Sequence, residues 1–396
     1  MTIFTQKAPI LVTCPKDIPP YLEEELHGLG FDRTHALDAG VETYGTLKDC
    51  MHLNLWVRTG HRVFHELKRF RAFDADELYR EVLGLPWEDY IAKDGYFRVD
   101  AAIRDTTVTD SRFAGLRVKD AVADRFMEQF GERPDSGPDT SGVCLFLHWN
   151  RNQATLYLDT TGDPLPRRGY RKRPHKAPMQ ETLAAACILS SGWPELAKKG
   201  GHFIAPMCGA GTLAIEAALM ALNGAPGLLR DNFSFMHLPG FDADAWDDML
   251  GAAEDAENPE ITGRIIATDH DPEAVEAARD NARLAGVGDF IEFAVCDYSE
   301  TEIPEGPGIV MLNPEYGERL GEMDKLESVY KGIGDFFKKE CGGKTGFIFT
   351  GNSRLAKRVG LRTKSRKIFW NAKIECRLLE YELYAGSKKA ISAPES

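Results

Sequence analysis

Short apolar runs alternate with helical patterns through the second half of the chain. The apolar runs cover residues 203–204, 265–267, 291–295, 309–312 and 346–350. A run with helical spacing, Leu213-Ala-Ile-Glu-Ala-Ala-Leu219, follows the first of them. Because strands that alternate with helices form βαβ units, the pattern predicts an α/β domain with a doubly wound, mainly parallel sheet. Residues 374–384 are expected to form a last strand.

The first half of the chain has shorter and more mixed patterns. Leu22, Leu26 and Leu29 share one face of a predicted helix that stops at Gly30. The other predicted elements are a strand at 96–103, a helix at 119–130 and a hairpin of 144–149 with 155–158. This mixture predicts an α+β region.

Turn-forming and basic residues separate the two halves. They fill residues 159–178, so we expect a basic linker at 161–178 and an α/β domain at 179–386. Residues 387–396 are expected to form a flexible tail.

Composition narrows the class of protein. The chain has 396 residues, 43% of them hydrophobic and 28% charged, which suits a globular protein with more than one core. No apolar run reaches the roughly 18 residues that a membrane helix needs, and the first residues lack the features of a signal peptide. We therefore expect a cytoplasmic protein.

Cysteine spacing and net charge exclude further classes. The eight cysteines show no CxxC spacing, which disfavours a disulfide framework and a zinc site, and we expect no metal. The net charge of -13 disfavours nonspecific coating of nucleic acid, although a local basic face remains compatible with it.

A glycine pair stands between the first predicted strand and its helix. The segment reads Pro206-Met-Cys-Gly-Ala-Gly-Thr212. Glycines at this place let the backbone approach a ligand closely. No Gly-Lys-Ser/Thr follows, so S-adenosylmethionine (SAM) suits the loop better than ATP. The predicted cofactor contacts in the loop are Pro206, Cys208, Gly209, Gly211 and Thr212.

Acidic residues follow the next two predicted strands. Asp269 is expected to accept hydrogen bonds from the cofactor's ribose, although residues 222–262 lengthen its usual distance from the glycine loop. Asp271, which precedes Pro272, is expected to cap a helix. Asp297 is placed to accept a hydrogen from the adenine amino group. Each acid alone is also compatible with a solvated turn.

The most specific motif is Leu312-Asn-Pro-Glu-Tyr-Gly-Glu-Arg-Leu320, after the fourth predicted strand. The Asn313 amide oxygen and the Pro314 carbonyl can accept both hydrogens of a planar NH₂ group, and Asn313 also borders the cofactor site. Such acceptors favour transfer of a methyl group to the nitrogen through alignment and charge placement. Tyr316 is predicted to stack on an extruded base. The residues alone leave guanine N2, adenine N6, cytosine N4 and a glutamine amide as targets.

Basic residues cluster twice in this acidic chain, which suggests contacts with RNA phosphates. The first cluster comprises Arg167, Arg168, Arg171, Lys172, Arg173 and Lys176. The second comprises Arg354, Lys357, Arg358, Arg362, Lys364, Arg366 and Lys367.

Taken together, these motifs resemble those of the bacterial THUMP-domain guanine-N2 methyltransferases, especially the methyltransferase half of the large-subunit rRNA enzyme. The resemblance covers nearly the whole chain. It rests on Asn54-Leu-Trp-Val-Arg-Thr-Gly, Leu116-Arg-Val-Lys-Asp-Ala-Val122, Leu158-Asp-Thr-Thr-Gly-Asp, Arg168-Gly-Tyr-Arg171, Ala177-Pro-Met-Gln-Glu-Thr-Leu-Ala-Ala-Ala186 and the two motifs above.

The resemblance implies a ferredoxin-like unit at 1–50, a THUMP RNA-binding domain at 51–160 and a Rossmann-like catalytic domain. It adds Lys119 to the predicted RNA contacts and favours guanine N2 in 23S rRNA. Guanine N2 of a tRNA, adenine N6 of RNA or DNA, and a non-catalytic RNA-binding or ribosome-assembly factor remain alternatives. The oligomeric state stays open.

Two positions depart from the family pattern. Ala205 stands where the family usually has an acid, and Glu315 stands where it usually has a second proline. We expect the first departure to weaken the contact with the cofactor's amino-acid end and the second to add charge beside the target pocket.

Overall fold

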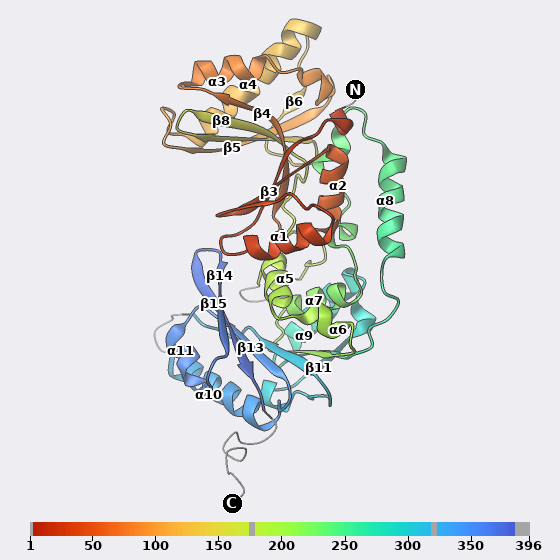
Figure 1. Cartoon of the computed structure of the whole chain (residues 1–396), viewed down its shortest axis with the longest axis vertical. Helices are drawn as coiled ribbons and strands as arrows, with labels where there is room; N and C mark the ends of the chain where they lie inside the picture. Colours follow the sequence, from red (N-terminus) through yellow and green to blue (C-terminus); the bar gives the residue numbers. More distant parts are fainter. Residues whose placement is uncertain (1–2, 174–178, 318–322, 385–396) are drawn as a thin grey trace, which may run out of the picture. The chain divides into compact units, whose positions relative to one another are not determined.

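The computed structural model describes residues 3–173, 179–317 and 323–384. The chain divides into two compact units (Figure 1). The N-terminal unit contains Met1–Arg167 and Ala225–Asp255, and the C-terminal unit contains Arg168–Gly224 and Ala256–Ser396. No helix among the described residues has the length and apolar character needed to cross a bilayer.

One mixed sheet, in the order β2-β3-β1-β4-β8-β7-β5-β6, forms the centre of the N-terminal unit. Its strands are β1 (Ala8–Thr13), β2 (His35–Leu37), β3 (Gly40–Gly45), β4 (Arg62–Arg71), β5 (Tyr96–Arg104), β6 (Asp135–Ser136), β7 (Val143–Asn150) and β8 (Gln153–Asp159). Its helices are α1 (Pro19–Gly28), α2 (Leu47–Trp56), α3 (Ala75–Leu83), α4 (Ser111–Phe130) and α8 (Ala243–Asp255). The predicted hairpin is present as β7 and β8, which pair antiparallel.

The predicted boundary between residues 50 and 51 falls inside a helix. Helix α2 runs unbroken from Leu47 to Trp56, and Thr46 and Asp49 form a capping box at its start. Strand β4 pairs with β1 on one side and with β8 on the other, so a single sheet joins the two predicted domains. That boundary, which the resemblance implied, is therefore wrong, because the residues on its two sides share one helix and one sheet.

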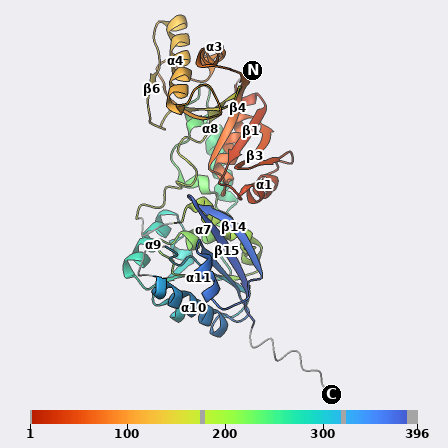
Figure 2. The same ribbon diagram turned by 90° about the vertical axis from the view of Figure 1, so that its left-hand side faces the viewer.

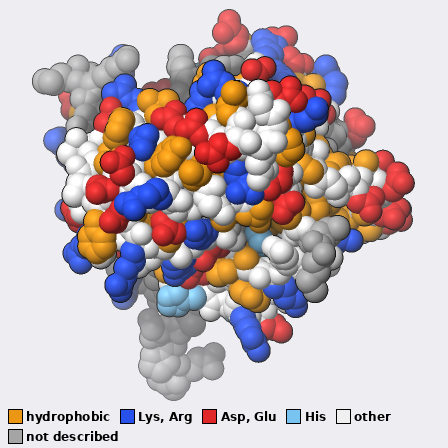
Figure 3. Space-filling model, turned by 90° about the horizontal axis from the view of Figure 1, so that it is seen from above, with side chains coloured by type: hydrophobic (Ala, Val, Ile, Leu, Met, Phe, Trp, Pro, Cys, Tyr) orange, Lys and Arg blue, Asp and Glu red, His pale blue; other side chains and the backbone are white. Residues whose placement is uncertain are grey.

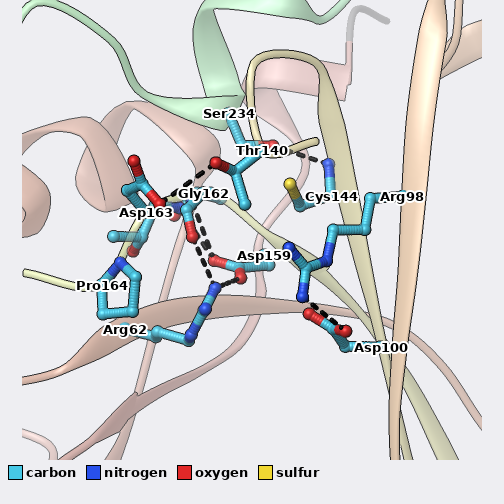
Figure 4. A network of polar contacts seen from close by, with 12 residues as sticks. Arg62, Arg98, Asp100, Thr140, Cys144, Asp159, Gly162, Asp163, Pro164 and Ser234 are labelled. Carbon is cyan, nitrogen blue, oxygen red and sulfur yellow. Dashed lines mark hydrogen bonds and ion pairs between the residues drawn. The ribbon is translucent and has the colours of Figure 1, made fainter. Parts of the chain in front are cut away.

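Residues 225–255 belong to the N-terminal unit, although the prediction placed them in the α/β domain. Phe233, Phe235 and Trp246 form a buried aromatic cluster with ring centroids 5.0–5.8 Å apart. The Ser234 hydroxyl accepts a hydrogen bond of 2.8 Å from the Cys144 backbone N–H (Figure 4). Burial of these rings holds the segment 225–255 in the N-terminal unit.

The first part of the predicted linker is packed rather than loose. Arg62 binds the Asp159 carboxylate and donates to the Gly162 carbonyl at 2.6 Å (Figure 4). The Thr161 hydroxyl donates to the Asn54 side-chain oxygen at 2.6 Å. Buried polar groups therefore hold residues 159–162 in place, which corrects the expectation of a linker from residue 161. Residues 174–178, with Lys176, lie outside the described part of the chain.

The C-terminal unit contains the predicted doubly wound sheet, in the order β11-β10-β9-β12-β13-β15-β14. Its strands are β9 (His202–Pro206), β10 (Ile265–Asp269), β11 (Ile291–Val295), β12 (Gly308–Leu312), β13 (Thr345–Thr350), β14 (Ser365–Asn371) and β15 (Ile374–Glu382). Its helices are α5 (Glu181–Ser190), α6 (Trp193–Ala197), α7 (Thr212–Ala221), α9 (Pro272–Leu284), α10 (Met323–Lys339) and α11 (Ser353–Arg358). Strands β9 to β13 are parallel, whereas β14 and β15 form an antiparallel hairpin at one edge, which confirms the predicted α/β class.

Helices cover both faces of this sheet. Tyr330 and Phe337 of α10 pack in one core cluster with Ile204 of β9 and Val310 of β12. Phe203, the preceding residue of β9, instead contacts Trp193 of α6, with ring centroids 5.1 Å apart. Helices α10 and α11 contact each other and lie side by side in both views (Figures 1 and 2). Both faces are therefore buried, as a parallel sheet requires.

Candidate active site

The four predicted site elements follow four neighbouring parallel strands. The register pairs Pro206 of β9 with Thr268 of β10, and Asp269 of β10 with Val295 of β11. Strand β12 pairs with β9 on its other side. The chain leaves β9 toward β10 and later returns to β12, so the sheet order reverses between β9 and β12. Ligands of doubly wound folds bind beyond the carboxyl ends of the strands at such a switch point.

The glycine loop forms a tight turn between β9 and α7. The Cys208 N–H donates to the Thr268 carbonyl at 2.8 Å, which ties the loop to β10. Gly211 precedes α7 with φ +86°, and a Cβ on it would lie 2.9 Å from the Ala278 Cβ. Only glycine suits this position, because any side chain would be both strained and crowded. Thr212 then begins the helix.

The Cys208 side chain belongs to the predicted cofactor site. Burial raises the pKa of its thiol. A thiol that stays protonated is a poor nucleophile, so a structural or contact role suits Cys208 better than covalent chemistry.

Asp269 connects the glycine loop with the end of β10. One carboxylate oxygen accepts from the Gly209 N–H at 3.0 Å, and the other accepts from the Asp271 N–H at 3.0 Å. Asp271 itself accepts from the Glu273 N–H at 2.9 Å, and Pro272 is the first residue of α9. The capping prediction for Asp271 is therefore confirmed. The ribose contact of Asp269 stays a prediction.

Asp297 lies at the start of a short 3₁₀ turn (Tyr298–Glu300) after β11. One of its carboxylate oxygens accepts from the Ser299 N–H at 2.9 Å and from the Ser299 hydroxyl at 2.5 Å. A turn role is thus present, and the adenine contact stays a prediction that involves the other oxygen.

Asn313 follows β12, and its side-chain amide oxygen has no hydrogen-bond partner among the described residues. That oxygen is buried, and Pro314 beside it is also buried. An unpaired buried acceptor costs about 1–3 kcal/mol, and a ligand or a water that supplies the missing donor removes this cost. The geometry thus holds an acceptor ready at the switch point.

Tyr316 packs against its own domain. Its ring contacts Phe349 edge-on at 6.3 Å, and a Cβ on Gly351 would come within 3.1 Å of that ring. The Asn371 amide donates to its hydroxyl at 2.8 Å, and burial raises the pKa of that hydroxyl to about 12. Stacking on a base stays a prediction and would use the part of the ring that this packing leaves accessible. Residues 318–322 of the motif lie outside the described part of the chain.

The two departures from the family pattern lie in different surroundings. Ala205 is fully buried in β9, where it pairs with Ala267 of β10. Glu315 is exposed beside the Asn313–Pro314 turn. An acid at position 205 would therefore be buried beside the loop, whereas Glu315 places its charge in solvent.

Two of the predicted RNA contacts are internal ion pairs. Arg168 is 1% exposed and lies 3.4 Å from the Glu216 carboxylate. Arg171 binds Glu181 at 3.1 Å and the Thr212 hydroxyl at 3.2 Å. Their prediction as RNA contacts is wrong, because both guanidinium groups neutralise buried carboxylates. The local sequence does not show that these acids are inside.

The other predicted RNA contacts differ in their surroundings. Arg167 and Lys172 are exposed, and Arg167 lies 3.2 Å from Asp163. Arg173 lies 2.6 Å from Asp280, and the Lys119 ammonium group donates to the Ser136 carbonyl at 3.4 Å. Figure 3 shows a face of the molecule on which basic side chains are interspersed with acidic ones. RNA contacts of these four residues stay predictions.

A glycine loop, an acid after the second strand and an Asn-Pro turn after the fourth, all at one switch point, define a Rossmann-like domain of the methyltransferase class. The model of the RMKL-like methyltransferase domain matches residues 168–380, and the chain belongs to this family. The RlmL ferredoxin-like domain matches residues 9–64 and the THUMP domain matches residues 72–159.

Curated relatives support this assignment. The chain is 40% identical over 98% of its length to ribosomal RNA large subunit methyltransferase K/L of Syntrophotalea carbinolica, of which it covers 56%. It is 33% identical over 95% of its length to "Putative RNA methyltransferase slr0064" of Synechocystis, of which it covers 97%. The chain thus spans about half the length of the K/L relatives that it matches.

Solved structures share the fold. The structure of SMU.472 complexed with S-adenosylhomocysteine (SAH) has a TM-score of 0.86 and 27% identity, covering 97% of this chain and 100% of that one. A predicted N6-adenine-specific DNA methylase from Listeria monocytogenes has a TM-score of 0.84 and 29% identity, covering 95% and 96%.

Proposed function

We propose that this protein uses SAM to methylate the exocyclic amino group of a base in RNA, with guanine N2 of 23S rRNA as the favoured target. The buried Asn313 oxygen without a donor carries the proposal, because an amino group is the ligand that satisfies it. The pairing of β12 with β9, the strand before the glycine loop, supports a common site for this acceptor and the predicted cofactor contacts.

The residues present fit SAM. The glycine loop from Met207 to Gly211 ends at the start of α7, and no lysine follows that would hold a triphosphate. The Asp269 oxygen that accepts from the Gly209 N–H keeps a second lone pair for a ribose hydroxyl, whereas the other oxygen also lies 3.3 Å from the exposed His270 imidazole. When bound, SAM supplies an electrophilic methyl group.

Asn313 and Pro314 would orient the target nitrogen. Acceptors on both amino hydrogens would pull the nitrogen away from planarity and localise its lone pair. The new N–C bond would then form as the bond between the methyl carbon and the sulfonium sulfur breaks, which leaves SAH. One amino proton then leaves to solvent. Orientation and hydrogen bonding supply the catalysis, so no covalent nucleophile is needed.

The relatives favour RNA as the substrate. The K/L relatives are named rRNA methyltransferases, and a THUMP-domain model matches this chain. Adenine N6 is the second candidate target, because the Listeria relative carries the name of an adenine methylase. A non-catalytic RNA-binding factor is the third candidate function, because Ala205 and Glu315 depart from the family pattern.

One experiment separates these functions. The protein is incubated with SAM and deproteinised rRNA from a strain that lacks it, and the digested nucleosides are measured by mass spectrometry. We expect N2-methylguanosine. N6-methyladenosine alone would overturn the choice of base. No methylated nucleoside from rRNA or tRNA, with SAM bound, would indicate the non-catalytic factor.

A further inference from the structure

A basic cavity lies in the C-terminal unit next to the candidate active site. It has a volume of about 580 Å³, is partly open to solvent and is bordered by the end of β13, helix α11 and the β14–β15 hairpin. Lys357, Arg362, Arg366 and Arg377 line it, together with one acid, Glu375. We call it the basic cavity.

The side chains of the second basic cluster of the sequence differ in their partners. Arg354 and Arg358 both bind Glu327, at 2.8 and 2.7 Å, and Lys364 binds Glu380 at 2.7 Å. Lys357 and Arg362 line the basic cavity, and no carboxylate of the described residues lies within 4.0 Å of either. The seventh cation, Lys367, donates to the Ser190 carbonyl and does not line the cavity. The cations of this cluster that line the cavity are therefore Lys357, Arg362 and Arg366.

The other two arginines are only partly satisfied by protein groups. Arg377 lies 3.3 Å from Glu375, and both side chains are about half exposed, so this pair competes with solvent. The Arg366 guanidinium donates to the neutral Thr363 hydroxyl at 3.0 Å. The cavity thus keeps a positive charge after its internal contacts are counted.

The cavity shares a wall with the catalytic turn. Gly351 lines the cavity, and the Tyr316 ring packs directly over Gly351. Asn371, at the end of β14, donates to the Tyr316 hydroxyl. The register pairs Thr350 with Arg377, so this arginine lies at the sheet edge that carries Asn313. An anion in the cavity would lie beside the target base.

We propose that the basic cavity binds backbone phosphates of the RNA nucleotides that flank the target base; this inference rests on the proposed function. Guanidinium groups bind phosphate with two parallel hydrogen bonds. The volume is typical of sites for ligands larger than one phosphate, roughly 300–1,000 Å³. Held phosphates would fix the register of the strand while the Asn313 turn reads the amino group.

A matched pair of variants tests this proposal. Lys357→Ala/Arg362→Ala removes two exposed cavity cations, and Arg354→Ala/Arg358→Ala removes two exposed cations from the same segment that bind Glu327. Each variant changes the net charge equally. Retention of labelled 23S rRNA on filters is measured over a range of salt concentrations, with SAH titration as the control for folding.

We expect the cavity variant to bind rRNA about ten-fold more weakly at physiological salt. The slope of log affinity against log salt should fall by about 1.4, or about 0.7 for each phosphate contact with a single strand. The control variant should change affinity less than about two-fold, and both variants should bind SAH normally.

Other results would overturn the cavity site. An equal loss of rRNA affinity in both variants would indicate a general effect of charge instead of a phosphate site. Unchanged rRNA affinity in the cavity variant would exclude a phosphate site in the cavity. Guanosine monophosphate that binds the wild type but not the cavity variant, with rRNA binding unchanged, would assign the cavity to a free nucleotide. If the wild type binds rRNA without methylating it, the proposed function fails while the paired comparison still decides the cavity.

Discussion

The Asp269 carboxylate accepts a hydrogen bond from the Gly209 backbone N–H at 3.0 Å, across 60 residues of sequence. The same side chain that is predicted to bind the cofactor's ribose therefore also shapes the glycine loop. This coupling means that the two predicted cofactor elements form one structural unit.

Asp269→Asn should weaken SAH binding by about 1–3 kcal/mol, because an amide nitrogen replaces one of the two oxygens that accept hydrogen bonds. Isothermal titration calorimetry measures this loss. Asp271→Ala is the matched control, since it removes the cap of α9 and should cost about 1 kcal/mol of stability while leaving affinity nearly unchanged. Equal affinity in wild type and Asp269→Asn would reject the assignment.

Asn313→Ala should lower the rate of methyl transfer far more than SAH affinity. The acceptor acts as the nitrogen pyramidalises, so its loss should cost on the order of 10²–10³ in turnover by analogy with oxyanion-hole groups. Single-turnover methylation and SAH titration of the same variant separate the two effects. A parallel fall in affinity and rate would indicate that Asn313 supports the cofactor instead.

Arg168→Met should destabilise the protein by about 3–5 kcal/mol, because it leaves the Glu216 carboxylate charged and unpaired in the core. Urea unfolding measures the change. The double variant Arg168→Met/Glu216→Gln should recover most of this loss, since Gln keeps an oxygen for the Tyr170 hydroxyl that now donates at 3.1 Å. Substitution of the exposed Lys172 by Ala should cost little. A destabilisation by Lys172→Ala as large as that by Arg168→Met would contradict the burial argument.

Removal of residues 1–167 alone should yield an aggregation-prone protein. Phe233, Phe235 and Trp246 would lose the unit in which they are buried. The two residues that flank the segment 225–255 lie close together, because the Asn223 side-chain amide donates to the Ala256 carbonyl at 3.1 Å.

Replacing 225–255 by a short Gly-Ser linker in the same truncation should therefore restore a folded protein that binds SAH. Dye binding to exposed apolar surface and SAH titration compare the two truncations. If the first truncation is already monomeric and folded, residues 225–255 do not depend on the N-terminal unit.

The elements that place the active site could be predicted because their signals are local. Strand β11 has the predicted bounds, and Asp271 with Pro272 starts α9 as expected. Parallel strands bring their carboxyl ends to one edge whatever the length of the segments between them. The glycine loop, Asp269 and Asn313 could therefore be assigned to one edge even though residues 222–262 intervene.

The basic stretch at 354–367 shows where local signals fail. Strand β14 was missed, because Ser365-Arg-Lys-Ile-Phe-Trp-Asn371 begins with charges and lacks a clear alternation. Its pairing with β15 overrides that weak local preference. The division of its cations between Glu327 and the basic cavity depends on α10, which lies before the stretch in sequence.

The sequence by itself determined the fold class and the order of the predicted site elements, because hydrophobic period and turn residues act over a few positions. Only the tertiary structure decided that Arg168 is buried, that residues 225–255 leave their domain and that Lys357 and Arg362 face a cavity. Burial and charge pairing depend on partners distant in sequence, such as Glu216 for Arg168 and Cys144 for Ser234. No local pattern encodes those partners.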